Sequence, residues 1–320
     1  MKIVLVFIVC FMISRDVQGE NPGKPLLIKL PVAFSCVGRD PIIVENTPVI
    51  FNGQLLMVAN LRSSVKGKEG ESYLYVDDIL KGQEITRFGT GHAFVSAIVD
   101  GPNLNVFALD FSNSGKVWES NGIDRFVTAD LKTWKQEKAI LPEGEKKLFN
   151  NSVCKDETGF VMAYESNLPV QWCFRFARSK DLSKWEKLPG LVFSGEHNEF
   201  SACPVIRYIK PYYYVIYTHD RMKGHNGWLP FLARSKDLEN WEHTPFNPIM
   251  EATKGEGINN SDFDILEYEG RTYLYYGDGD QATWGNICVA MYDGPMKKFF
   301  ESYFPEGETF ISFSAKRLIK

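Results

Sequence analysis

One stretch of this chain recurs almost unchanged. Residues 174–185 read FRFARSKDLSKW, and residues 231–241 read FLARSKDLENW. Looser copies lie at 126–134, 73–79 and 288–294, and the aspartates of the five copies, at positions 78, 130, 181, 237 and 293, are 52, 51, 56 and 56 residues apart. A fixed period of this length indicates a repeat architecture whose units stack on one another.

The composition of each copy favours β-structure. An apolar strand leads into Ser/Thr-x-Asp-Leu, whose short polar side chains can bond to the local backbone and shape a turn, and a Trp then opens the next strand. An α-solenoid is excluded because the apolar runs alternate or are continuously β-branched and aromatic, without helical spacing. The sequence predicts an all-β fold, a five-bladed β-propeller of four-stranded antiparallel blades, at about 41–90, 91–143, 145–195, 197–250 and 255–312.

The N-terminus predicts secretion. Lys2 precedes an apolar run over residues 3–13, and a polar stretch ending at Gly19 follows it. We interpret residues 1–19 as a signal peptide, since the apolar run is shorter than the roughly 20 residues of a membrane helix. The mature chain, residues 20–320, is then one extracellular propeller domain with no membrane partner, and an uncleaved anchor is the weaker alternative.

Charge and cysteine usage limit the partners. A net charge of -4 without a basic cluster argues against nucleic acid, while the 14% aromatic content suits both blade packing and sugar stacking. Five cysteines remain after cleavage; Cys154 and Cys203 could pair, with buried free thiols as the alternative. No spacing suggests zinc, and we expect no cofactor beyond a possible structural calcium at Asp278-Gly279-Asp280.

A set of polar residues falls at one face of the predicted disc. In an up-and-down blade, the start of the first strand and the loop between the second and third strands lie on the same face. First-strand starts carry Asp40, Glu45, Asn46, His92, Asn150, Asn151, His197, Glu199, Asn259, Asn260, Asp262 and Asp264. The loops carry Asp110, Glu165, His219, Asp220, Asp278 and Asp280, with one tryptophan each, namely Trp118, Trp172, Trp228 and Trp284. Carboxylates interleaved with aromatics around one axis suit a glycosidase funnel.

These features resemble the five-bladed propeller glycosidases: the arabinanase and xylosidase family forty-three, the invertase-like family thirty-two and the anhydrogalactosidase family one hundred and seventeen. The likeness rests on the period, the Ser-Lys-Asp-Leu-x-x-Trp turns and the apolar first strands, over roughly residues 36–312. It implies an acid from blade one as base or nucleophile, with further acids from later blades as proton donor and pKa modulator. Arg39-Asp40-Pro41 is similar to the invertase-like Arg-Asp-Pro signature, so either Asp40 or Glu45 is the blade-one acid.

The chain departs from the family pattern in three places. Ala202 stands where the invertase-like Glu-Cys-Pro would place its acid, although Glu199 lies nearby. Asn150-Asn151-Ser152 occupies the position of a modulating Asp, and Asp262 and Asp264 are additional acids in blade five. The catalytic candidates are therefore Glu45, Glu199, Asp262, Asp264 and Asp40, and the substrate-binding candidates are His92, Asn151, Glu165, His219, Trp228, Asn260 and Trp284.

The predicted chemistry is hydrolysis of an oligosaccharide. One carboxyl group must keep its proton near neutral pH to protonate the glycosidic oxygen, and another must stay ionised to activate water or attack the anomeric carbon. We expect a secreted glycoside hydrolase. The alternatives are a secreted carbohydrate-binding propeller that has lost the acids and, more weakly, a protein-interaction propeller. The aspartates of the repeated turns are expected to be structural.

Overall fold

The computed structural model describes residues 23–35, 42–63, 71–113, 119–143, 147–170, 172–196, 200–220, 227–280, 284–307 and 310–314. The predicted signal peptide lies outside these ranges. None of the helices in them is long and apolar enough to cross a membrane.

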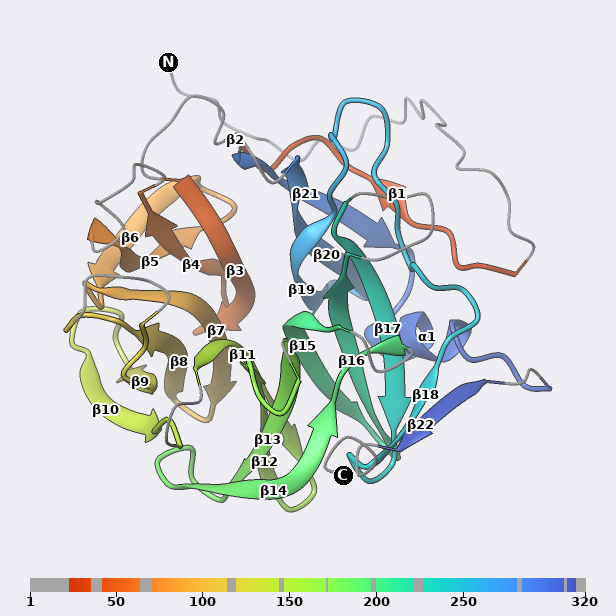
Figure 1. Cartoon of the computed structure of the whole chain (residues 1–320). Coiled ribbons are helices and arrows are strands. Elements are labelled where there is room, and N and C mark those ends of the chain that lie inside the picture. Colours follow the sequence, from red (N-terminus) through yellow and green to blue (C-terminus); the bar gives the residue numbers. More distant parts are fainter. Residues whose placement is uncertain are drawn as a thin grey trace.

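Five antiparallel sheets surround a common centre, which confirms the predicted five-bladed propeller (Figure 1). Blade one is β3 (Ile42–Phe51), β4 (Gln54–Arg62), β5 (Tyr73–Asp78) and β6 (Gln83–Phe88). Blade two is β7 (His92–Asp100), β8 (Asn103–Asp110), β9 (Ile123–Thr128) and β10 (Lys135–Ile140). Blade three is β11 (Leu148–Asp156), β12 (Gly159–Ser166), β13 (Cys173–Ser179) and β14 (Trp185–Phe193). Blade four is β15 (Ala202–Ile209), β16 (Tyr212–His219), β17 (Leu229–Ser235) and β18 (Asn240–His243), and blade five contains β19 (Ser261–Tyr268), β20 (Arg271–Gly279) and β21 (Trp284–Tyr292).

The two chain ends complete blades to which the repeat does not assign them. The outer edge of blade five comes from β1 (Ile28–Lys29) and β2 (Phe34–Ser35), which both pair with β21. The C-terminal β22 (Ile311–Ser314) adds a fifth strand beside β18 in blade four. The helix α1 (Met296–Ser302) lies between β21 and this last segment. Blade five is thus closed by residues from the opposite end of the chain.

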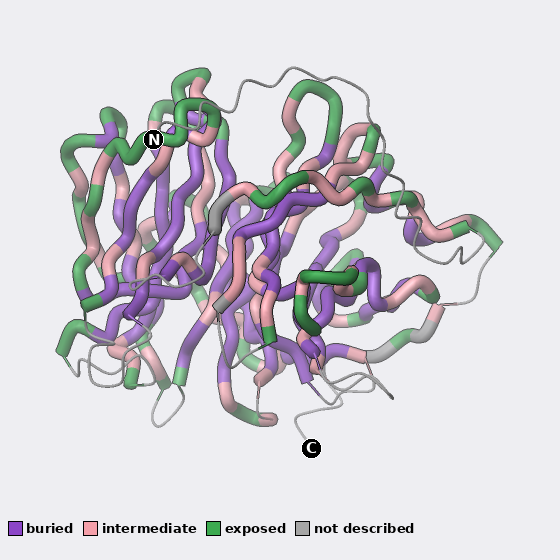
Figure 2. The backbone as a smooth tube through the Cα atoms, turned by 90° about the horizontal axis from the view of Figure 1, so that it is seen from above, coloured by how far each residue is buried: buried purple, intermediate pink, exposed green. Residues whose placement is uncertain are grey.

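The burial of each strand reflects its place in the disc. Middle strands such as β12 are almost continuously buried, because both their faces pack against neighbouring blades. Outer strands such as β6 and β10 carry polar residues and are largely exposed. Figure 2 shows the same division, with buried stretches running along the strands and exposed residues gathered at turns and outer edges.

Hydrophobic clusters fill each interface between blades and close the ring. Residues of blades one and two pack together, as do those of blades two and three, three and four, and four and five. The last interface joins Met57 and Tyr75 of blade one to Tyr275 and Val289 of blade five. Because these sheets cannot bury their faces alone, each blade depends on both neighbours.

The repeated Ser/Thr-x-Asp-Leu-x-x-Trp segment is a structural turn, as predicted. In blade four, Asp237 Oδ1 accepts hydrogen bonds from the backbone N–H groups of Glu239 at 2.9 Å and Asn240 at 2.8 Å. Leu238 adopts a left-handed φ of 64° while its side chain is buried. Trp241 Nε1 donates to the Leu238 carbonyl at 3.1 Å, so the tryptophan locks the turn that precedes it. Asp130 and Asp181 accept equivalent bonds in blades two and three.

The turn tryptophan of blade four is a strong test of blade packing. Trp241 is 1% exposed and stacks against Phe176 of the preceding blade. We expect Trp241→Ala to lower the free energy of unfolding by about 3–5 kcal/mol through lost burial and a residual cavity. Urea denaturation measures the change. Lys132→Ala, at the exposed tip of the blade-two turn, should stay within about 0.5 kcal/mol. A loss below about 1 kcal/mol for Trp241→Ala would contradict this account of the interface.

Candidate active site

The first strands of the five blades face one another at the centre of the molecule, where β3, β7, β11, β15 and β19 form a ring (Figure 1). Each of these inner strands contains a β-bulge at the same level, because two of its residues stand opposite one residue of the second strand. The bulged pairs are 44–45, 94–95, 149–150, 203–204 and 262–263. Phe94, Cys203 and Asp262 have positive φ angles of 55°, 52° and 51° at these bulges. Such strained backbone is characteristic of functional sites.

The bulges surround a central hollow. It is lined by Glu45, Asn46, Val95, Ser96, Asn150, Asn151, Cys203, Pro204, Asp262, Phe263 and Asp264. All five inner strands contribute to this lining, and it contains three carboxyl groups. The hollow is therefore the place where the propeller brings together acids that are distant in sequence.

Two of the predicted acids, Glu45 and Asp262, lie in the hollow and interact electrostatically. Glu45 is buried, with Arg62 Nη1 at 4.0 Å from its Oε1 and no hydrogen-bond partner for its Oε2 among the described residues. Burial raises the pKa of Glu45; Arg62 opposes this effect, and the nearby charge of Asp262 adds to it. Burial also raises the pKa of Asp262. Two such groups do not ionise independently, so the pair holds a proton to a higher pH than an exposed carboxyl group would.

Hydrogen bonds distinguish the two members of this pair. Asp262 Oδ2 accepts from Ser261 Oγ at 2.8 Å, and Asp262 Oδ1 accepts from Cys203 Sγ at 3.3 Å. Both donors lower the pKa of Asp262 against the effect of burial. Asp262 is also partly exposed to solvent, whereas Glu45 is buried. For Glu45 the opposing effect comes mainly from the charge of Arg62, with a smaller one from Asn60, whereas for Asp262 it comes first from these two hydrogen bonds.

A third carboxyl group, Glu165 at the end of β12, lies directly behind the lining. Its Oε2 accepts from Asn150 Nδ2 at 2.9 Å and from the Cys203 backbone N–H at 3.2 Å. Burial raises the pKa of Glu165 to about 7, and Asp262 and Glu45 contribute to the increase. The sequence pattern predicts Glu165 as a substrate-binding residue, but its side chain is 2% exposed and its contacts are with the lining residues.

Cys203 connects the acids of this site. Its backbone bonds to Glu165 and its thiol bonds to Asp262, while Asn150 Nδ2 lies 3.5 Å from its sulfur. Burial raises the pKa of the Cys203 thiol well above its ordinary value, so it is a neutral donor. Cys203 and Cys154 are both free, which excludes the disulfide between them that the sequence left open.

The other predicted residues of the inner strands have structural partners. Asp264 lines the hollow but forms an ion pair with Arg207. Asn151 lines the hollow, accepts from Ser96 Oγ at 2.5 Å and donates to the Phe94 carbonyl at 3.0 Å. Asn260 is fully buried and accepts from Lys29 Nζ of β1 at 3.2 Å. Asp40 and Glu199, and the side chain of Trp284, lie outside the described residues.

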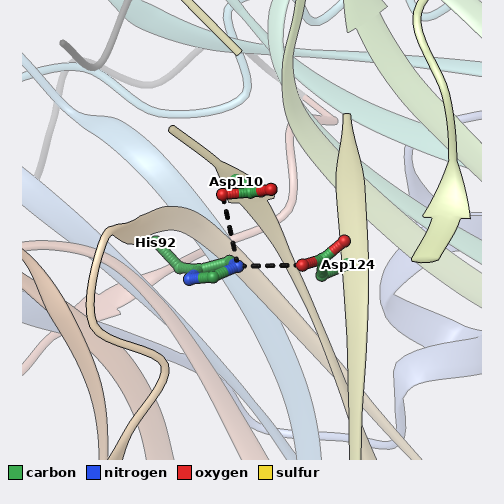
Figure 3. Close-up of side chains that lie close together, drawn as sticks. All are labelled: His92, Asp110 and Asp124. Atoms are coloured by element: carbon green, nitrogen blue, oxygen red, sulfur yellow. Dashed lines mark hydrogen bonds and ion pairs between the residues drawn. The ribbon is translucent and has the colours of Figure 1, made fainter. Parts of the chain in front are cut away.

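His92 belongs to a separate cluster within blade two, shown in Figure 3. Its Nε2 lies 3.1 Å from Asp124 Oδ2 and 3.9 Å from Asp110 Oδ1, and its Nδ1 lies 3.1 Å from the Thr90 carbonyl. Lys138 forms ion pairs with both aspartates, at 2.9 Å from Asp110. The cluster has the composition of a metal site, but the lysine ammonium supplies its positive charge. The contacts of His92 therefore lie within blade two, and it is not among the residues that line the hollow.

Two of the predicted substrate-binding residues, both aromatic, lie in blade four at the connection between β16 and β17. His219 is buried against Phe200 and Phe231, with ring centroids 6.1 and 5.0 Å away. Trp228 is partly exposed and packs against Phe200, with the ring centroids 5.1 Å apart.

The Asp278 carboxylate accepts hydrogen bonds from the backbone and side chain of Asn286. A calcium ion at this turn stays a prediction.

The sequence pattern did not assign a site role to Cys203, Arg62 or Asn60. Asn60 stands opposite the blade-one bulge as Glu165 stands opposite the blade-three bulge. Aligning the second strands of the blades by this position would have placed Asn60 and Glu165 next to the centre. The thiol role of Cys203 has no signal in the repeat, because the bulge that turns it toward Asp262 depends on tertiary packing.

No family model and no curated protein matches this sequence. Solved structures do match its fold. A BT0996 RGII complex aligns at TM-score 0.66 with 18% identity, over 84% of this protein and 93% of that one. The α-L-arabinofuranosidase PaAbf62A from Podospora anserina, in complex with cellotriose, aligns at 0.62 with 11% identity over 85% and 98%. The β-1,2-mannobiose phosphorylase from Listeria innocua aligns at 0.62 with 11% identity over 87% and 99%.

The pKa of Glu165 generates a prediction for stability. The folded pKa, about 7, exceeds the ordinary value of 4.5. The stabilising effect of the proton is therefore complete below pH 4.5 and is lost as the pH rises through 7. Glu165→Gln keeps the shape and stays neutral, so the variant should gain about 3 kcal/mol relative to wild type between about pH 4.5 and pH 8. Urea denaturation across this range measures the difference. Exposed Glu186→Gln is the control, and parallel curves for Glu165→Gln and wild type would contradict the assignment.

The blade-two cluster predicts the opposite pH dependence. Burial opposes the ionisation of Asp110, but hydrogen bonds from Ser112 and Lys138 lower its pKa to about 2. We expect Lys138→Met to reduce the free energy of unfolding at about pH 7 by about 2 kcal/mol, because two buried carboxylates lose their cation. The deficit should shrink below about pH 4, where the aspartates of the variant become protonated. Chemical denaturation tests this, with exposed Lys135→Met as control, and a deficit that is constant with pH would disprove it.

The chain therefore has the propeller fold of these solved structures, and three carboxyl groups from its blades one and five line the central hollow.

Proposed function

We propose that this protein is a secreted glycoside hydrolase that cleaves an oligosaccharide in the central hollow. The observation that carries the proposal is the coupled pair of Glu45 and Asp262, which come from blades one and five and line one hollow. Glycosidases need two carboxyl groups in different protonation states, and two interacting groups whose pKa values are both raised can supply one proton and one charge. The glycan-related neighbours of the fold, among them an arabinofuranosidase with cellotriose, support a saccharide ligand.

The local contacts assign roles within the pair. Glu45 would keep its proton and donate it to the glycosidic oxygen, because its buried Oε2 has no partner among the described residues. Asp262 would stay ionised and act on water or on the anomeric carbon, since Ser261 and Cys203 donate to its oxygens. The charge state of Glu165 would modulate the pKa values of Glu45 and Asp262, because it interacts electrostatically with each of them. Asn151 and Ser96, which also line the hollow and bond to each other, would use their remaining hydrogen-bonding capacity on sugar hydroxyl groups.

One observation favours a second candidate, a carbohydrate-binding propeller without catalysis. Blade four places Cys203, not an acid, at the bulge equivalent to that of Asp262. Ala202 stands just before Cys203, where the invertase-like pattern would place its acid, and the Cys203 thiol, whose pKa is raised, is a neutral donor that does not replace that acid. In this case the hollow would bind the sugar without cleaving it, and the carboxyl groups would accept hydrogen bonds from the sugar hydroxyl groups.

A hydrolysis panel separates the two candidates. Aryl glycosides and oligosaccharides of arabinose, xylose, glucose and mannose are incubated with wild-type protein and with Glu45→Gln and Asp262→Asn. On any sugar that is turned over, each substitution should lower kcat by about 10²–10⁴-fold, because each removes a proton-transfer or nucleophilic group. Asp237→Asn, in a repeated turn, should leave kcat within about twofold.

The outcomes of this panel are distinct. Turnover that survives both substitutions would refute the assigned roles. No turnover, together with measurable sugar affinity, would establish the binding protein instead.

A further inference from the structure

We propose that Trp172, Phe200 and Trp228 form an aromatic arc that binds the second sugar ring of the ligand, outside the ring held between Glu45 and Asp262. The proposal rests on the proposed function only in requiring a saccharide ligand. The sequence places Trp172 and Trp228 in loops at the face of the predicted funnel, and the structure adds Phe200, which joins the three side chains into one surface on blades three and four.

The arc has the packing of a rigid platform. Phe200 is buried, and its ring lies 6.4 Å from that of Trp172 and 5.1 Å from that of Trp228. Phe149 supports Trp172 from blade three at 4.8 Å. The two indoles are partly exposed, while Phe149 and Phe200 are each 3% exposed. Two accessible indoles backed by buried phenylalanines offer flat apolar surface with little loss of side-chain entropy on binding.

Backbone hydrogen bonds tie the arc to the strands that carry the acids. The N–H group of Ser201, which lies two residues before Cys203, donates to the Trp172 carbonyl at 2.9 Å. Asn260 N–H donates to the Trp228 carbonyl at 2.9 Å, two residues before Asp262, and Trp228 N–H donates to Asn259 Oδ1 at 3.0 Å. Both tryptophans thus lie beside the first residues of an inner strand, β15 or β19, whose next residues line the central hollow. A sugar ring on the arc would be adjacent to one in the hollow.

The other tryptophans whose side chains the structure describes differ in position and in partners. Trp185 and Trp241 belong to repeated turns, where their Nε1 atoms donate to Leu182 and Leu238 carbonyls at 2.9 and 3.1 Å. Trp134 of the blade-two turn stacks on Phe88 of blade one. Trp172 instead has a positive φ of 60°, outside any repeated turn. The pyranose or furanose ring that packs on the arc would present its apolar C–H face to the indoles.

The test measures binding without requiring turnover. Isothermal titration with cellotriose, xylotriose and β-1,2-mannobiose is performed on wild type, Trp228→Ala, Trp172→Ala and the conservative Trp228→Phe. For a saccharide that binds, each alanine variant should weaken affinity about tenfold, because a desolvated stacking surface is lost. Trp228→Phe should retain most of the affinity. The corresponding monosaccharide, which would occupy only the site between Glu45 and Asp262, should bind all variants within about twofold of wild type.

Two controls guard against misfolding. Trp185→Phe changes a turn tryptophan and should leave all affinities unchanged, and circular dichroism reports the fold of each variant. Addition of the saccharide should also change tryptophan fluorescence in wild type but not in the Trp172→Phe, Trp228→Phe double variant.

Each outcome decides the proposal. Saccharide binding that is unaffected by both alanine variants overturns the arc and leaves hydrolysis to the panel above. Binding of none of the three saccharides by wild type also overturns it. Binding that depends on the arc without any turnover supports the arc while the proposed hydrolysis fails.

Discussion

The site depends on a β-bulge that occurs at one level of every inner strand. Two residues of the first strand stand opposite one residue of the second, so the strand bends and its side-chain alternation shifts. In blades one and five this shift places Glu45 and Asp262 in the hollow, and in blade four it turns the Cys203 thiol toward Asp262. A regular strand could not bring these three groups to one level.

Closure of the ring offsets the instability of this arrangement. Buried carboxyl groups with raised pKa values destabilise the folded state at neutral pH, because folding removes their hydration. Clusters at all five blade interfaces compensate for this loss, and the N-terminal strands β1 and β2 complete the edge of blade five. Lys29 of β1 also reaches Asn260, two residues before Asp262. The N-terminal segment thereby supports the loop that leads into the site.

The period of the sequence was sufficient to predict the fold, because five similar units with turn and strand signals leave few other architectures. It also placed Glu45, Asn151, Asp262 and Asp264 at the centre, since these residues follow directly from the position of each first strand. His92, which the period also assigned to this face, has its partners Asp110 and Asp124 within blade two, because the alternation of side chains along a strand does not hold across a bulge. The two-residue strands β1 and β2 were not predictable either, as they are too short to show any alternation.

The central claim is that Glu45 and Asp262 titrate together and hold a proton to a higher pH than exposed carboxyl groups do. Carbon-13 NMR of protein labelled at the side-chain carboxyl carbons of Glu and Asp, titrated from about pH 3 to pH 9, observes this directly. The account predicts a Glu resonance, lost in Glu45→Gln and distinct from that of Glu165, that titrates above the range of exposed carboxyl groups, and it predicts that Asp262→Asn lowers its inflection because the neighbouring charge is gone. If both carboxyl groups ionise near about pH 4 and neither titration responds to the loss of the other, the coupled pair does not exist.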